Sequence, residues 1–109
     1  MTAKEFVESA GLSVICMPDP EKTVSSAYVG DLLSWVMGRA EPDNVWITIM
    51  SNKNIVAVAS LVGVGCILLC EGVTLDDEVS ALASEKDVNV FSTELSAYDA
   101  AIKISGILR

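Results

Sequence analysis

The second half of the chain repeats one pattern of apolar and polar positions three times. Each repeat has a short apolar run, a small polar loop and a stretch with helical spacing, and the runs cover residues 45–49, 66–69 and 88–91. Apolar runs of this length between turn residues are typical of buried strands. Because strand–loop–helix units build parallel sheets, the pattern predicts an α/β fold. We expect a mostly parallel sheet of four to five strands with helices on both faces.

The first half is patterned differently. It predicts a helix over residues 3–10 and a strand over residues 12–17, which either extends the sheet or lies across it. Residues 22–29 are expected to form a loop or a short extended piece that ends in Ala27-Tyr28-Val29. Asp31 is the expected N-cap of the next helix, and Gly38 is its expected end.

The second half predicts three further helices, over residues 55–62, over residues 77–86 and after Ser96. Their expected N-caps are Asn52 or Asn54, Thr74 or Asp76, and Ser96. In the last helix we expect one apolar stripe made of Tyr98, Ala101, Ile102, Ser105 and Leu108.

The amino-acid composition indicates a compact chain with an excess of apolar residues. The 109 residues are expected to form one domain, 1–109. Half of them are apolar (51%), and the mean hydropathy is +0.49. A parallel sheet buried on both faces and a partner covering apolar surface would each explain this excess, and we expect both. A homodimer is the commonest closed assembly.

The charge balance argues against two classes of partner. The formal net charge is -8, which repels nucleic-acid backbones and anionic lipids. Residues 54–70 carry no charge, but this run is shorter than a membrane-spanning helix and is interrupted by Gly63 and Gly65. We therefore expect neither nucleic-acid binding nor a membrane segment.

The cysteine and histidine content limits which disulfides, metal sites and catalytic sites the chain can form. The chain has three cysteines, Cys16, Cys66 and Cys70. An odd number of cysteines without a recognisable secretory signal favours the reducing cytoplasm. Cys66 and Cys70 lie too far apart on a strand to pair, so each is interpreted as a buried apolar residue. The chain has no histidine, which excludes histidine triads and most zinc sites.

A candidate ligand site lies where the strands of the predicted sheet end. Parallel strands present the loops at their carboxyl ends along one edge. Small hydroxyls, amides and turn glycines there suit a small polar ligand, although the same residues could simply be the N-caps that such turns need. The candidate ligand-binding residues are Gly30, Ser51, Asn52, Asn54, Glu71, Gly72, Ser92, Thr93 and Glu94.

A catalytic function of this edge has less support in the sequence than ligand binding. A Ser51/Lys53 pair could supply a nucleophile and a base, and the pair Glu71/Glu94 could bind a metal or a cation. Surface loops are usually polar, and this alone explains why Ser51, Lys53, Glu71 and Glu94 occur there. We therefore expect no catalytic residues, no metal site and no cofactor.

The repeats also resemble a known family. Residues 45–48, 55–59, 66–72 and 88–93, together with the turn at 29–31, are similar to the DRTGG domain, which is related to the N-terminal domain of HPr(Ser) kinase/phosphorylase. The family usually has an Asp-Arg pair after the strand matched by residues 45–49, whereas this chain has Ser51-Asn52. The resemblance implies a regulatory module with an α/β fold and no kinase activity, because nothing here matches the kinase's phosphate-binding loop.

Three functions remain open at this point. The first is a non-catalytic regulatory or ligand-binding homodimer that modulates a metabolic enzyme or kinase. The second is a protein-interaction scaffold without a small ligand. The third is a small enzyme that uses Ser51/Lys53 or Glu71/Glu94.

Overall fold

The computed structural model, which describes residues 1–108, contains one five-stranded sheet with the strand order β1-β5-β4-β3-β2. Strands β2 to β5 are parallel, and β1 runs antiparallel to β5. The strands are β1 (Ser13–Cys16), β2 (Ala27–Val29), β3 (Val45–Thr48), β4 (Cys66–Leu69) and β5 (Val90–Ser92). The helices are α1 (Ala3–Ala10), α2 (Leu33–Arg39), α3 (Asn54–Val62), α4 (Asp77–Glu85) and α5 (Ala97–Ser105). The predicted α/β fold with a mostly parallel sheet is confirmed.

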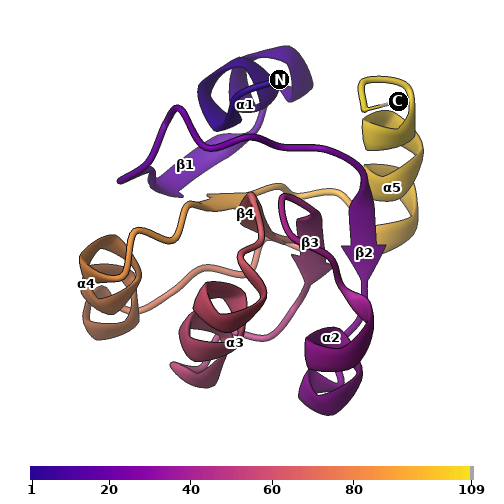
Figure 1. Ribbon diagram of the computed structural model, residues 1–109. Helices are drawn as coiled ribbons and strands as arrows, with labels where there is room; N and C mark the ends of the chain where they lie inside the picture. Colours follow the sequence, from indigo (N-terminus) through magenta and orange to yellow (C-terminus); the bar gives the residue numbers. More distant parts are fainter. Residues whose placement is uncertain (109) are drawn as a thin grey trace.

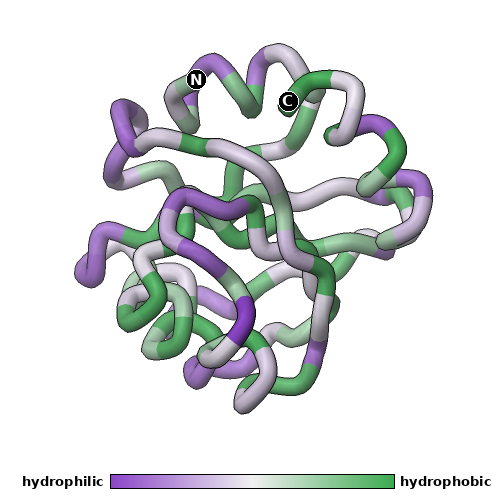
Figure 2. Tube along the Cα trace, turned by 45° about the vertical axis from the view of Figure 1, so that its right-hand side comes forward, coloured by the Kyte–Doolittle hydropathy of each residue, from purple (hydrophilic) through white to green (hydrophobic). Residues whose placement is uncertain are grey.

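Helices cover both faces of the sheet, as the sequence predicts. Figure 1 shows α1 and α5 on one face and α2, α3 and α4 on the other. Each face has its own group of buried side chains, with Phe6, Phe91 and Ile104 on the first and Val36, Ile55 and Val79 on the second. Figure 2 shows hydrophobic stretches in the interior of the trace and also along its outer coils, which agrees with the exposed large apolar residues of the chain.

The central strands supply both cores at once. In β3, Val45 and Ile47 pack on the α1–α5 side, whereas Trp46 packs on the opposite side. Successive strand residues point to opposite faces, and here both faces are covered. This is why these strands read as continuous apolar runs without alternation.

The N-terminal helix and strand extend the sheet rather than crossing it. The Thr2 hydroxyl accepts a hydrogen bond from the Glu5 amide, and the Glu5 carboxylate accepts one from the Thr2 amide. This capping box lowers the pKa of Glu5 through its hydrogen bonds with Thr2. Gly11 ends α1 in the left-handed region at φ 63°, and β1 then pairs antiparallel with β5.

Two predictions about α2 are wrong. Asp31 is not its N-cap, because α2 begins after Leu32 and has no side-chain cap. The Asp31 carboxylate instead accepts hydrogen bonds from the neighbouring strand end. Gly38 does not end the helix either, since α2 continues through it to Arg39.

The expected apolar stripe of α5 is only partly correct, since Ala101 and Leu108 pack against the core whereas Tyr98, Ile102 and Ser105 are exposed. Ser96 caps this helix by accepting a hydrogen bond from the Asp99 amide, as predicted. The buried residues are Ala100 and Ile104, whereas Tyr98 is 75% exposed and Ile102 is 54% exposed. Both sets keep helical spacing, so spacing alone did not identify which one faces the sheet.

The other two helix starts are partly as predicted. Asp76, rather than Thr74, caps α4 through the Val79 amide. Asn52 accepts a hydrogen bond from the Asn54 amide at the start of α3, although the N-cap residue itself is Lys53.

The three thiols are free, and two of them are buried as predicted. Cys66 and Cys70 lie in the same core as Phe91, whereas Cys16 is only partly buried. Within the described part of the chain, no helix is both long and apolar enough to cross a bilayer.

Candidate functional site

The loops at the carboxyl ends of β2 to β5 meet at one edge of the sheet, hereafter the carboxyl edge. Thr48 of β3 is in register with Leu69 of β4, and Leu69 is in register with Ser92 of β5. The three strands therefore end side by side. The prediction that their polar loops share one edge is confirmed.

Asp31 joins the ends of β2 and β3. The Thr48 hydroxyl donates to the Asp31 Oδ1 at 2.6 Å, and the Ile49 amide donates to the same oxygen at 3.2 Å. Thr48 is 2% exposed, so its hydroxyl needs this acceptor. Sequence reasoning did not place Thr48 in the site, although a hydroxyl at the end of an apolar strand was a usable signal.

Main-chain hydrogen bonds hold the remaining loops together. The Cys70 amide donates to the Thr48 carbonyl at 3.1 Å, which joins the ends of β3 and β4. The Thr93 amide donates to the Leu69 carbonyl at 2.9 Å, and the Gly72 amide donates to the Thr93 carbonyl at 3.0 Å. The loops after β3, β4 and β5 thus form one connected rim.

The turn after β4 has a strained backbone. Glu71 has a φ of 60° and Gly72 has a φ of 72°. The Glu71 amide donates to the Leu95 carbonyl at 2.9 Å, which holds this conformation. A Cβ on Gly72 would collide with the Glu94 carboxylate, so Glu94 lies directly over this glycine. A left-handed Glu is uncommon and is maintained by its surroundings.

Most of the predicted site residues lie on this edge. Gly30 donates its amide to the Ile47 carbonyl and accepts a hydrogen bond from the Trp46 indole. Asn54 is the exception, because it belongs to the first turn of α3 and lines a groove between α3 and α4. The residues that the edge brings together are Gly30, Ser51, Asn52, Glu71, Gly72, Ser92, Thr93 and Glu94.

The nearby thiol is poorly suited to nucleophilic chemistry. Burial raises the pKa of Cys70 to about 11, and the carboxylates of Glu71 and Asp31 add to the shift. The thiolate is the reactive form of cysteine, so Cys70 is unreactive near neutral pH. Burial also raises the pKa of Cys66.

The geometry bears differently on the two proposed catalytic pairs. The loops of Glu71 and Glu94 do converge, since the Glu71 amide donates to the Leu95 carbonyl and the Glu94 carboxylate lies over Gly72. Among residues 1–108, no hydrogen bond joins Ser51 to Lys53. The same part of the chain contains no group of three His, Cys, Asp or Glu side chains placed to hold a metal ion. The four edge loops offer hydrogen-bonding groups and carboxylates, and Lys53 in the loop after β3 is their one basic residue.

Comparison with known proteins gives the family to which this α/β domain belongs. The DRTGG domain model matches residues 5–107. The chain therefore belongs to the DRTGG domain family.

A solved structure has the same fold at low sequence identity. It contains the CBS and DRTGG domains of the regulatory region of Clostridium perfringens pyrophosphatase, in complex with the activator diadenosine tetraphosphate. The TM-score is 0.71 at 16% identity, over 98% of this chain and 47% of the other. This chain thus spans about half of that one. None of the curated proteins compared with the chain matches it.

Proposed function

We propose that this chain is a non-catalytic regulatory module that binds a small polar ligand at the carboxyl edge and modulates a metabolic enzyme or kinase. The observation that carries the proposal is the connected rim, in which Asp31, Thr48 and Thr93 tie four loops into one edge. Membership of the DRTGG family supports the regulatory role, since the related fold above comes from a regulatory region.

The charge of the edge indicates the class of ligand. Asp31, Glu71 and Glu94 follow three of its four strands, in a chain of net charge -8. Carboxylates repel phosphates and attract cations. A neutral or cationic ligand with several hydrogen-bonding groups suits the edge better than an anionic one.

A homodimer is supported by apolar surface next to this edge. Val29, Leu32, Trp35 and Ile49 are each about half exposed, and they lie around Asp31, which binds the Ile49 amide. We call these four residues the α2 patch. It adjoins β2, the outermost parallel strand of the sheet (Figure 1). Clustered apolar side chains of this size commonly mark an interface, and a second copy of the chain would cover them.

A protein-interaction scaffold is the alternative function, and the α2 patch favours it equally. In that case the patch binds a different protein, and the polar residues of the edge serve only as caps and turns. The two functions differ in whether a small molecule stabilises the chain.

Thermal unfolding with added ligands tests the proposal. The panel contains L-arginine, putrescine and adenosine, with adenosine monophosphate as an anionic comparison. A ligand that binds only the folded state raises the Tm. We expect a cationic or neutral compound to raise it, and Glu71→Gln to remove the effect while Glu8→Gln on α1 retains it. If no compound raises the Tm, the ligand-binding proposal fails and the scaffold remains.

A further inference from the structure

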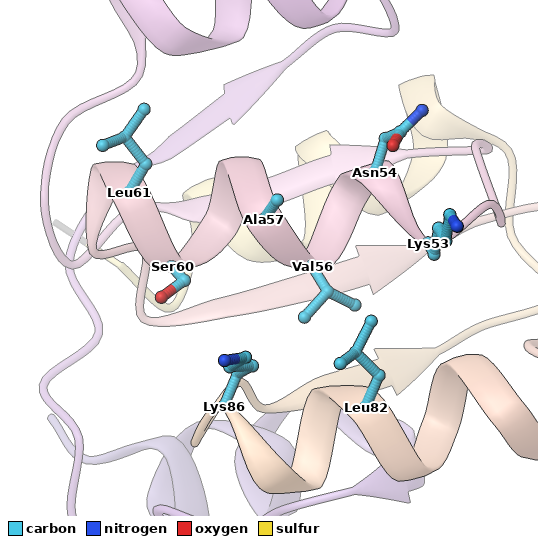
Figure 3. A pocket seen from close by; sticks show the side chains of 8 residues that line it. All are labelled: Lys53, Asn54, Val56, Ala57, Ser60, Leu61, Leu82 and Lys86. Carbon is cyan, nitrogen blue, oxygen red and sulfur yellow. The ribbon is translucent and has the colours of Figure 1, made fainter.

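A groove on the outer surface lies between α3 and α4, and one end of it adjoins the carboxyl-edge loop after β3 through Lys53 and Asn54. Figure 3 shows Val56 of α3 pointing toward Leu82 of α4, and Ala57, further round α3, also lines the groove. The cavity measures about 490 Å³, which is within the size range of small-molecule sites. Its walls combine apolar side chains of the two helices with the polar side chains of Asn54 and Ser60.

A lysine stands at each end of this apolar groove. Lys53 precedes α3 at one end, and Lys86 follows α4 at the other end, beside Ser60 (Figure 3). The seven residues of helix from Lys53 to Ser60 span about 10 Å. The two ammonium groups can therefore bind charges at opposite ends of one extended molecule.

Neither lysine forms an ion pair within the part of the chain that the structure describes. The one ion pair among residues 1–108 joins Lys22 to Asp43 at 3.2 Å. Acidic side chains do line the adjoining hollows, with Glu78 and Glu85 beyond Lys53 and Asp19 and Asp87 beyond Lys86. Two free ammonium groups flanking an apolar wall remain notable, because the chain has only seven basic residues against fifteen acidic ones.

We propose that this groove binds a small dianion with an apolar body, of the class of a medium-chain dicarboxylate. The body packs on Ala57 and Leu82, and the carboxylates at its two ends pair with Lys53 and Lys86. This chemistry is opposite to that of the acidic carboxyl edge, so the groove is a second site.

Suberate, a dicarboxylate with eight carbons, is the probe, and isothermal titration calorimetry at low salt is the measurement. Octanoate retains one carboxylate and 1,8-octanediol retains neither. We expect saturable binding in the order suberate, octanoate, diol, with about a three- to tenfold loss for each missing carboxylate. Equal binding of suberate and the diol would overturn the proposal, as would no saturable heat with suberate at millimolar concentration.

Variants locate the site. Lys53→Gln and Lys86→Gln should each weaken suberate binding by about three- to tenfold. Ala57→Glu, at an exposed position, should abolish binding by placing a carboxylate on the groove wall. Lys4→Gln on α1, which covers the other face of the sheet, is the matched control and should change nothing. Suberate binding that survives Ala57→Glu would contradict the assignment.

Glu71→Gln separates this site from the carboxyl edge. It should leave suberate binding intact even if it removes the ligand response of the edge. The two proposals can therefore fail independently.

Discussion

The Thr48 hydroxyl donates a hydrogen bond of 2.6 Å to the Asp31 carboxylate and so fastens the end of β3 to the segment that follows β2. Thr48 is buried, whereas Asp31 lies at the surface. The donor of this hydrogen bond is therefore held in the core. The same carboxylate also accepts a hydrogen bond from the Ile49 amide. The hydrogen bond between Thr48 and Asp31 is the main side-chain contribution to the rim of the carboxyl edge.

Removing this hydroxyl should destabilise the chain. Thr48→Val keeps the side-chain shape and loses the hydrogen bond to a charged acceptor, so we expect a loss of about 1.5–3 kcal/mol in the free energy of unfolding. Urea denaturation measures it. Ser51→Ala, on the exposed loop beyond the same strand, is the control and should change stability by less than about 0.5 kcal/mol. Equal losses of unfolding free energy for both variants would mean that the Thr48 hydrogen bond does not stabilise the chain.

Two glycines should respond in opposite directions to alanine. A Cβ on Gly65 would lie 2.7 Å from the Thr23 carbonyl oxygen and 2.8 Å from that of Asp43. Gly65→Ala must therefore move main chain, and we expect a loss of about 2 kcal/mol or more. Gly38 lies inside α2 with nothing within 4 Å of its Cβ position, so Gly38→Ala should stabilise by about 0.5–1 kcal/mol.

Thermal denaturation of the two glycine variants provides the test. A lower Tm for Gly38→Ala would mean that α2 ends at this glycine, as the sequence first suggested. An unchanged Tm for Gly65→Ala would mean that the start of β4 is less tightly packed than described.

The buried thiols should make stability fall at alkaline pH. Burial raises the pKa of Cys70 from 9.0 in the unfolded chain to about 11, and it also raises the pKa of Cys66. Below pH 9 the thiols are neutral in both states, so their contribution is fully present. Between pH 9 and 11 the unfolded chain loses the thiol proton first, which favours unfolding.

Urea denaturation across this pH range measures the effect. Cys70→Ala should flatten the decline between pH 9 and 11 relative to the unsubstituted chain, whatever its stability at pH 8. A decline equally steep in both chains would mean that the Cys70 thiol ionises as readily in the folded state as in the unfolded one.

The α2 patch should control self-association. Trp35→Glu places a charge among Val29, Leu32 and Ile49, and burying it against a second copy would be costly. Sedimentation velocity should show a dimer for the unsubstituted chain and a monomer for Trp35→Glu. Tyr98→Glu, at an exposed position outside the patch, is the control. If the unsubstituted chain is a monomer at all concentrations, the homodimer proposal fails, and the α2 patch would then bind a different protein.

The sequence predicted the sheet because its signals were strong and local. The runs at 45–49, 66–69 and 88–91 became adjacent parallel strands, since only buried strands need continuous apolar residues. Thr2, Asp76 and Ser96 cap helices through their own side chains, so these starts were also recognisable.

Several of the failures depend on contacts between distant residues. Asp31 has the features of an N-cap, but Thr48, which is 17 residues away, provides its hydrogen bond instead. The inward face of α5 is decided by how the helix lies on the sheet, which puts Ile104 inside and Tyr98 outside. The α3–α4 groove depends on the packing of two helices, and its lysines are unremarkable in the sequence.

The most direct test of the ligand-binding account is a nuclear magnetic resonance titration of the ¹⁵N-labelled chain with L-arginine, putrescine, adenosine and adenosine monophosphate. The account predicts that a cationic or neutral compound shifts the amides of Asn52, Gly72 and Thr93 together, while Glu8 and Lys4 on α1 stay in place. It also predicts that adenosine monophosphate leaves the edge amides unmoved. An edge that responds to none of the cationic or neutral compounds, or responds equally to the anion, would contradict it.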